Sequence, residues 1–67
     1  MYNITKEEAI KVANLMNENY NLQLTPEMIS LIYSSNIQKI YVAAIYDSII
    51  GCKVDEDGNY SVKYFIL

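Results

Sequence analysis

The strongest sequence match to a known chemical site is the segment DEDGN at positions 55–59, near the C-terminal end of the chain. The first, third and fifth ligand positions of an EF-hand calcium loop are matched by Asp55, Asp57 and Asn59. The rest of that motif is missing, because Tyr60 stands where the loop needs a glycine and Ile66 where it needs a bidentate glutamate. We therefore expect no metal site in this segment.

The same segment can instead form a hairpin turn, and strand register tests this interpretation. A two-residue loop would place apolar residues opposite polar ones. A three-residue loop, 56–58, pairs Val54 with Tyr60 and puts Gly58 at the third loop position, where a left-handed residue with positive φ follows a type I turn. In this register Cys52 faces Val62 and Ile50 faces Tyr64. We predict a hairpin of residues 50–54 and 60–66, with the acidic side chains exposed at its tip.

No other arrangement of side chains indicates catalysis. The chain has no histidine, so the usual base for a serine or cysteine nucleophile is absent. The single cysteine, Cys52, lies on the apolar face of the predicted hairpin, where we expect a buried and inert thiol. Neighbouring carboxylates on an exposed turn have no pocket to separate their pKa values. The sequence indicates neither an enzyme nor a cofactor, and we predict no catalytic residue.

Length and composition limit the remaining possibilities. The 67 residues predict one domain, 1–67, and a domain of this size buries only about 60% of its unfolded surface. Yet 52% of the residues are hydrophobic, which favours a homodimer or an apolar partner surface. The net charge is −3, and all five basic residues are lysines. Nucleic-acid binding needs a basic face and favours arginine, so we expect no nucleic-acid ligand.

The setting is predicted to be the cytoplasm. One cysteine cannot form an internal disulfide, which favours a reducing compartment. No charged and then apolar leader opens the chain, and serine, asparagine, glutamine, lysine and aspartate interrupt the apolar-rich stretch 28–50. We expect neither a signal peptide nor a membrane span.

A first helix is predicted over residues 6–19. Thr5 and Glu8 have the spacing of a capping box, in which each side chain satisfies a backbone N–H of the other residue. One apolar stripe, expected to face the core, is made of Ala9, Val12, Ala13, Met16 and Tyr20.

The middle of the chain is predicted to be mostly helical. Residues 20–24 alternate in polarity and form a candidate strand. Thr25 and Pro26 are typical of a helix start, and Ser35 with Gln38 has the capping-box spacing again. We therefore predict helices over 26–34 and 36–49, with a single continuous helix as the alternative, and Gly51 as the C-terminal cap.

The predicted fold class is α+β: a small single domain of two or three helices followed by a C-terminal hairpin, with residues 20–24 as a candidate third strand. This order resembles that of winged-helix domains, whose third helix enters the major groove of DNA. The corresponding segment here, 36–47, has one lysine and one aspartate, and the tip of the wing is acidic. The resemblance implies the shape, with a protein-binding role in place of DNA binding.

Aromatic residues are the best candidates for contact with a partner. The chain has seven tyrosines, a residue type that is common at interfaces. Tyr33 and Tyr46 lie off the predicted core stripes. If the apolar face of the hairpin packs on the core, Phe65 and Leu67 point outward. The alternative is that the first helix covers the last strand and that both faces of this strand are buried.

We interpret the chain as a small acidic protein-interaction module. Its size and its Asn, Ile, Tyr and Lys content are similar to those of phage or mobile-element inhibitors, including anti-CRISPR proteins, that bind a host enzyme or defence complex. The alternative is a winged-helix-like transcriptional regulator that binds DNA as a dimer. The predicted partner-binding residues are Tyr33, Tyr46, Asp55, Glu56, Asp57, Phe65 and Leu67.

Overall fold

The first helix, α1, spans Lys6–Tyr20 in a computed structural model that describes residues 3–66 of the chain. The backbone N–H of Glu8 donates to Thr5 Oγ1 at 3.1 Å, which confirms Thr5 as the N-cap. Four residues of the predicted stripe are buried, namely Ala9, Val12, Ala13 and Met16, whereas Tyr20 remains 38% exposed. The position of the helix and its buried face from Ala9 to Met16 were therefore predicted correctly, whereas the placement of Tyr20 on that face was wrong.

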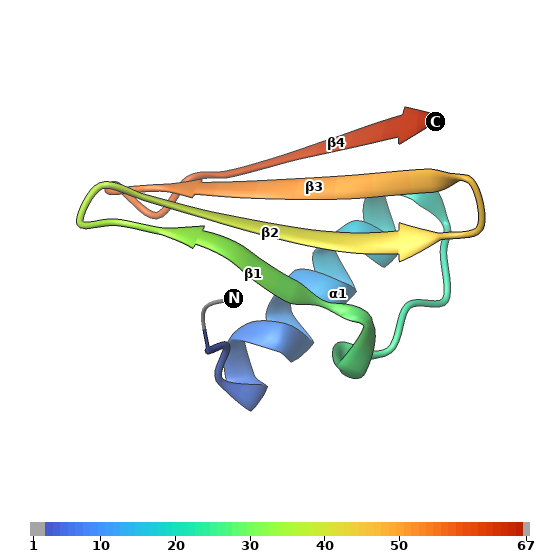
Figure 1. The fold of residues 1–67 in the computed structure, drawn as a ribbon, viewed down its shortest axis with the longest axis horizontal. Helices are drawn as coiled ribbons and strands as arrows, with labels where there is room; N and C mark the ends of the chain where they lie inside the picture. Colours follow the sequence, from blue (N-terminus) through green and yellow to red (C-terminus); the bar gives the residue numbers. More distant parts are fainter. Residues whose placement is uncertain (1–2, 67) are drawn as a thin grey trace.

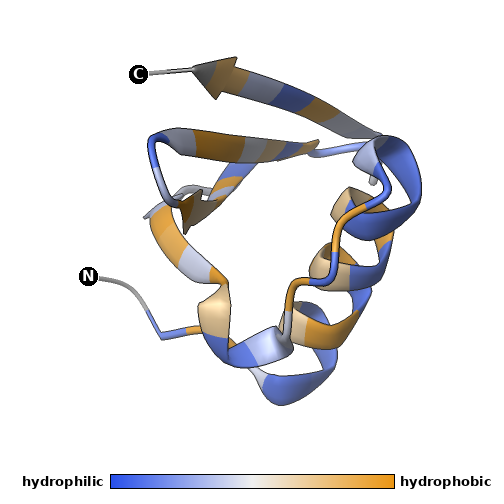
Figure 2. Cartoon of the chain, turned by 90° about the vertical axis from the view of Figure 1, so that its right-hand side faces the viewer, coloured by the Kyte–Doolittle hydropathy of each residue, from blue (hydrophilic) through white to orange (hydrophobic). Residues whose placement is uncertain are grey.

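Four antiparallel strands follow the helix and form one sheet in the order β1-β2-β3-β4. The strands are β1 (Ser30–Ser34), β2 (Gln38–Ile45), β3 (Ser48–Asp55) and β4 (Tyr60–Ile66), and a short 3-10 turn, η1 (Pro26–Met28), precedes them. The helix lies against one face of this sheet (Figure 1). Figure 2, turned by a right angle, shows helix and strands as two layers with hydrophobic residues in both.

The prediction of helices over 26–34 and 36–49 was wrong, and so was the alternative of one long helix. This stretch forms η1, β1, β2 and the beginning of β3. Its residues are apolar at both helical and strand spacings, so periodicity alone did not separate the two structures. Pairing of β2 with two neighbours decides for strands, because Tyr41 and Ala43 then point into the core together. Because this stretch forms strands, the predicted winged-helix order of elements was also wrong.

Ser35 shows how a local signal was misread. Its hydroxyl oxygen accepts from the backbone N–H of Gln38 at 3.1 Å, which is the contact that a helix cap makes. The Ser35 backbone N–H also donates to the Gln38 carbonyl at 2.8 Å, so the chain turns back on itself. The capping-box spacing here belongs to the turn between β1 and β2, since serine can serve either structure.

Two further predictions in this region were wrong. Residues 20–24 form no strand: Tyr20 ends α1, and the chain that follows is irregular. The Leu24 N–H donates to Asn17 Oδ1 at 2.8 Å, and Asn17 Nδ2 donates to the Leu24 carbonyl at 3.0 Å. A side chain thus satisfies the backbone groups that a neighbouring strand would have paired. Gly51 lies within β3, opposite Val42 and Lys63, and caps no helix.

The C-terminal hairpin was predicted in the correct register. Val54 pairs with Tyr60 and Lys53 with Ser61. The loop has three residues, since the Asp55 N–H donates to the Asn59 carbonyl at 3.1 Å and the Gly58 N–H to the Asp55 carbonyl at 3.0 Å. Gly58 has the positive φ that this turn requires, 80°. The β3 strand begins at Ser48, earlier than predicted.

The core lies between α1 and the sheet. Its side chains come from the buried stripe of the helix, from Leu24 and Ile29, and from the sheet residues Leu31, Tyr41, Ala43, Ile50 and Cys52. Among residues 3–66, no helix is long and apolar enough to cross a membrane.

Candidate functional site

One face of the sheet carries no covering layer within residues 3–66; we call it the open face. Side chains alternate between the two faces of a strand, so half of the sheet points away from α1. The apolar side chains with this orientation are Tyr33, Ile40, Val42, Ala44, Ile49 and Phe65. Tyr33 is 42% exposed and Phe65 47% exposed. The helix α1 lies on the other side (Figure 1), which leaves these residues in contact with solvent.

A shallow groove crosses the open face at Gly51. It has a volume of about 250 Å³ and runs between Ile40 on β2 and Phe65 on β4. Gly51 leaves room there, because a Cβ at this position would have its nearest neighbours, Lys63 O and Phe65 Cε2, at 4.0 Å. Two lysines border the groove: Lys53 is exposed, and Lys63 Nζ lies 5.2 Å from the centre of the Phe65 ring. The groove is therefore apolar at its base and basic at its rim.

The structure places the predicted contact residues in three separate regions. Tyr33 and Phe65 share the open face, although they lie on opposite edge strands, β1 and β4. Tyr46 occupies the β2–β3 turn, fully exposed, and the acidic turn of 55–57 lies at the opposite end of β3 (Figure 1). Leu67 lies outside the described residues. That any of these residues binds a partner stays a prediction.

Within the acidic turn, Asp55 has a structural role that the sequence reasoning did not assign. Its Oδ1 accepts from the backbone N–H groups of Asp57 and Asn59 at 3.0 and 2.9 Å. These bonds, chiefly that from Asn59, favour the charged form and lower the pKa of the Asp55 carboxyl. Only Glu56 and Asp57 therefore present side chains that the turn itself does not use.

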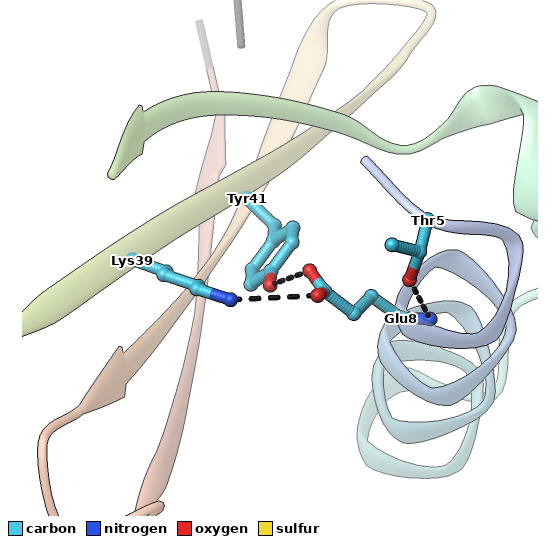
Figure 3. Close-up of polar contacts among 4 residues, drawn as sticks. All are labelled: Thr5, Glu8, Lys39 and Tyr41. Carbon is cyan, nitrogen blue, oxygen red and sulfur yellow. Dashed lines mark hydrogen bonds and ion pairs between the residues drawn. The ribbon is translucent and has the colours of Figure 1, made fainter. Parts of the chain in front are cut away.

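A polar cluster joins the start of α1 to the sheet (Figure 3). Tyr41 Oη donates to Glu8 Oε2 at 2.6 Å, and Lys39 Nζ lies 3.4 Å from Glu8 Oε1. The Tyr41 hydrogen bond, helped by Lys39, lowers the pKa of Glu8 against the opposing effect of burial. Burial first, and then Glu8, raises the pKa of Tyr41. The tyrosine is thereby held protonated as a hydrogen-bond donor.

This cluster borders a cleft of about 360 Å³ that lies between the start of α1, the β1–β2 turn and the β3–β4 turn. Sequence reasoning missed it because Glu8 was assigned to the capping box, and no local signal showed that its carboxylate would reach β2. The cluster has a structural role, because it links α1 to β2, and a protonated tyrosine and a paired carboxylate offer no nucleophile. Residues 3–66 also contain no group of three His, Cys, Asp or Glu side chains placed to hold a metal ion.

Cys52 is buried as predicted. It pairs with Tyr41 on one side and Val62 on the other, and its side chain has no exposed surface. Burial raises the pKa of the thiol to about 11, so the reactive thiolate is scarce near neutral pH.

No family model, curated protein or solved structure matches this chain. Within residues 3–66, the open face is the apolar surface that packing of the fold leaves uncovered.

Proposed function

We propose that this protein is a small interaction module that binds another protein through the open face, and that it acts as an inhibitor of the kind carried by phages and mobile elements. One observation supports the binding function above all: a four-stranded sheet shows an apolar face, with Tyr33 and Phe65 more than two-fifths exposed. Small domains usually bury such a face, and an exposed apolar patch marks interaction surfaces.

The composition of the face suits protein contact. Aromatic side chains at its two edges offer large contact area with few rotatable bonds, and aliphatic side chains lie between them. The inhibitory action that we propose is steric: a 67-residue protein that covers a working surface needs no chemistry of its own. The net charge of −3 adds repulsion from nucleic acid, which supports a protein partner.

The binding function is tested by affinity capture from a lysate of the source cell with three proteins. Phe65→Ser changes the open face, and Ile10→Ser makes a similar change at a 39% exposed position on α1. We expect the wild type and Ile10→Ser to retain the same complex and Phe65→Ser to lose it. Equal capture by all three proteins would show that the open face is not the binding surface.

The inhibitory action needs a second measurement. The captured enzyme is purified and assayed with increasing amounts of this protein. Activity should fall to a plateau near one equivalent with the wild type and with Ile10→Ser, and should be unchanged by Phe65→Ser. A captured enzyme whose activity the wild type leaves intact would refute inhibition while leaving the binding function in place.

A further inference from the structure

We infer that the occupant of the open face is an acidic amphipathic helix of a partner protein, with apolar side chains in the groove at Gly51 and carboxylates on Lys53 and Lys63. This inference rests on the proposed function and specifies the chemistry of the partner. It follows from the charge of the face, the size of the groove and the kind of contact that a sheet face offers.

The charge of the open face is opposite to that of the whole protein. Lys53 and Lys63 are exposed there, and the one ion pair within 4 Å among residues 3–66 joins Lys39 to Glu8 on the other side of the sheet. Among the described residues, Asp55 is the single carboxylate at the end of this face, near Lys53, and its oxygens accept hydrogen bonds within the turn. The other acids of the described chain lie on α1, η1 and the turns. The face is thus locally basic, and charge complementarity favours an acidic partner.

The groove fits a side chain better than a small molecule. Its volume of about 250 Å³ lies below the range of roughly 300–1,000 Å³ that is usual for ligand pockets. It is shallow, and Ile40 and Phe65 form its walls. A large aliphatic or aromatic side chain from a partner would fill the space that Gly51 leaves.

The partner segment should be helical because the face offers side chains and no backbone groups. An added strand needs unpaired N–H and C=O groups, which lie at a sheet edge. At the β4 edge strand, the Val62 carbonyl already accepts from Tyr20 Oη at 3.5 Å, and the β1 edge has an irregular register between Leu31 and Tyr33. A helix satisfies its own backbone and can lie on the face, as α1 does on the opposite one.

Two other occupants fit less well. A second copy of this chain would bring its own Lys53 and Lys63 to the interface, where like charges oppose association. Single-stranded nucleic acid would meet the lysines but needs adjacent aromatic rings for stacking. Tyr33 and Phe65 are separated by the width of the sheet, with Ile40, Val42 and Ile49 between them.

The test is selection from a displayed library of random 16-residue peptides on the immobilised full-length protein. The wild type should enrich sequences rich in Asp and Glu with aliphatic residues three and four apart. The double variant Lys53→Glu/Lys63→Glu should enrich basic sequences instead. Lys6→Glu/Lys11→Glu has the same net charge but alters only α1 and should select the same acidic sequences as the wild type.

A selected acidic peptide is then titrated into the isotope-labelled protein and followed by NMR. Shift changes should centre on Gly51 and Phe65, and the Lys53→Glu/Lys63→Glu variant should bind at least tenfold more weakly in low salt. Neutral or basic peptides that shift the same residues would overturn this inference and leave the proposed function standing. Peptides that bind without shifting Gly51 or Phe65 would count against both this inference and the proposed function.

The competing occupants are measured on the same samples. Light scattering should show that the wild type does not self-associate through this face, and a single-stranded oligonucleotide should produce no shifts at Gly51 or Phe65. A dimer that Phe65→Ser abolishes would show that the occupant of the open face is a second copy of this chain. Oligonucleotide binding that Lys53→Glu/Lys63→Glu abolishes would show that the occupant is nucleic acid. Either result would overturn the acidic helix.

Discussion

Replacement of Glu8 by alanine should destabilise the fold far more than its place in the first turn of a helix suggests. The Tyr41 hydroxyl donates to Glu8 from a residue that is only 3% exposed. Without an acceptor, such a buried hydroxyl costs about 1–3 kcal/mol. The Lys39–Glu8 pair adds less than about 1 kcal/mol, because its side chains are 42% and 34% exposed. We therefore expect a loss of about 2 kcal/mol, a large part of the stability of a domain this small.

The assay is urea unfolding followed by far-UV circular dichroism, with the slope of the transition checked for constancy. Glu7→Ala is the matched control, since Glu7 lies in the same first turn and accepts no hydrogen bond from the sheet. It should cost at most about 0.5 kcal/mol through the helix dipole. The cap is retained in both variants, because Thr5 binds the backbone N–H of residue 8.

A double-mutant cycle with Tyr41→Phe isolates the hydrogen bond. Loss of both partners should cost less than the sum of the single losses, with a coupling of about 1 kcal/mol or more. The pKa of Glu8 is lowered in the folded state, so its contribution is present above the unfolded value of 4.5 and is lost as the pH falls through the folded value. Equal losses for Glu7→Ala and Glu8→Ala, or strict additivity in the cycle, would show that the Tyr41–Glu8 hydrogen bond does not stabilise the fold.

Three further predictions concern the turns and the core. Gly58→Ala should lower the free energy of unfolding by about 1–2 kcal/mol, because φ is 80° at this position. Gly51→Ala should leave the urea midpoint nearly unchanged, since a Cβ there would have its nearest contacts at 4.0 Å. Equal losses of stability in the two variants would contradict the turn geometry. Tyr46→Asn should raise the melting temperature by relieving a positive φ of 49° at a side chain that is 103% exposed, and a lower melting temperature would reveal contacts that this geometry does not show. Cys52 should react with a disulfide reagent only as fast as the protein unfolds, so rapid modification of the native protein at pH 8 would show that the thiol is accessible.

Local signals in the sequence were sufficient for the two ends of the fold. Thr5 and the apolar stripe that begins at Ala9 determine α1, because capping and helical periodicity act within a few residues. Gly58 and the polarity of the flanking strands determine the β3–β4 hairpin in the same way. The burial of Cys52 followed directly from that register.

The structure of the middle of the chain and of the candidate site depends on contacts between residues far apart in the sequence. Residues from Ile37 to Ile45 satisfy a helical or a strand pattern, and the choice depends on pairing with β1 and β3, whose energy no local window contains. The same pairing brings Glu8 to Tyr41 across 33 positions of sequence and places Tyr33 and Phe65 on one face. The amino-acid composition sets how much apolar surface the protein must place. The fold determines which part of that surface stays open, because α1 covers only one side of the sheet.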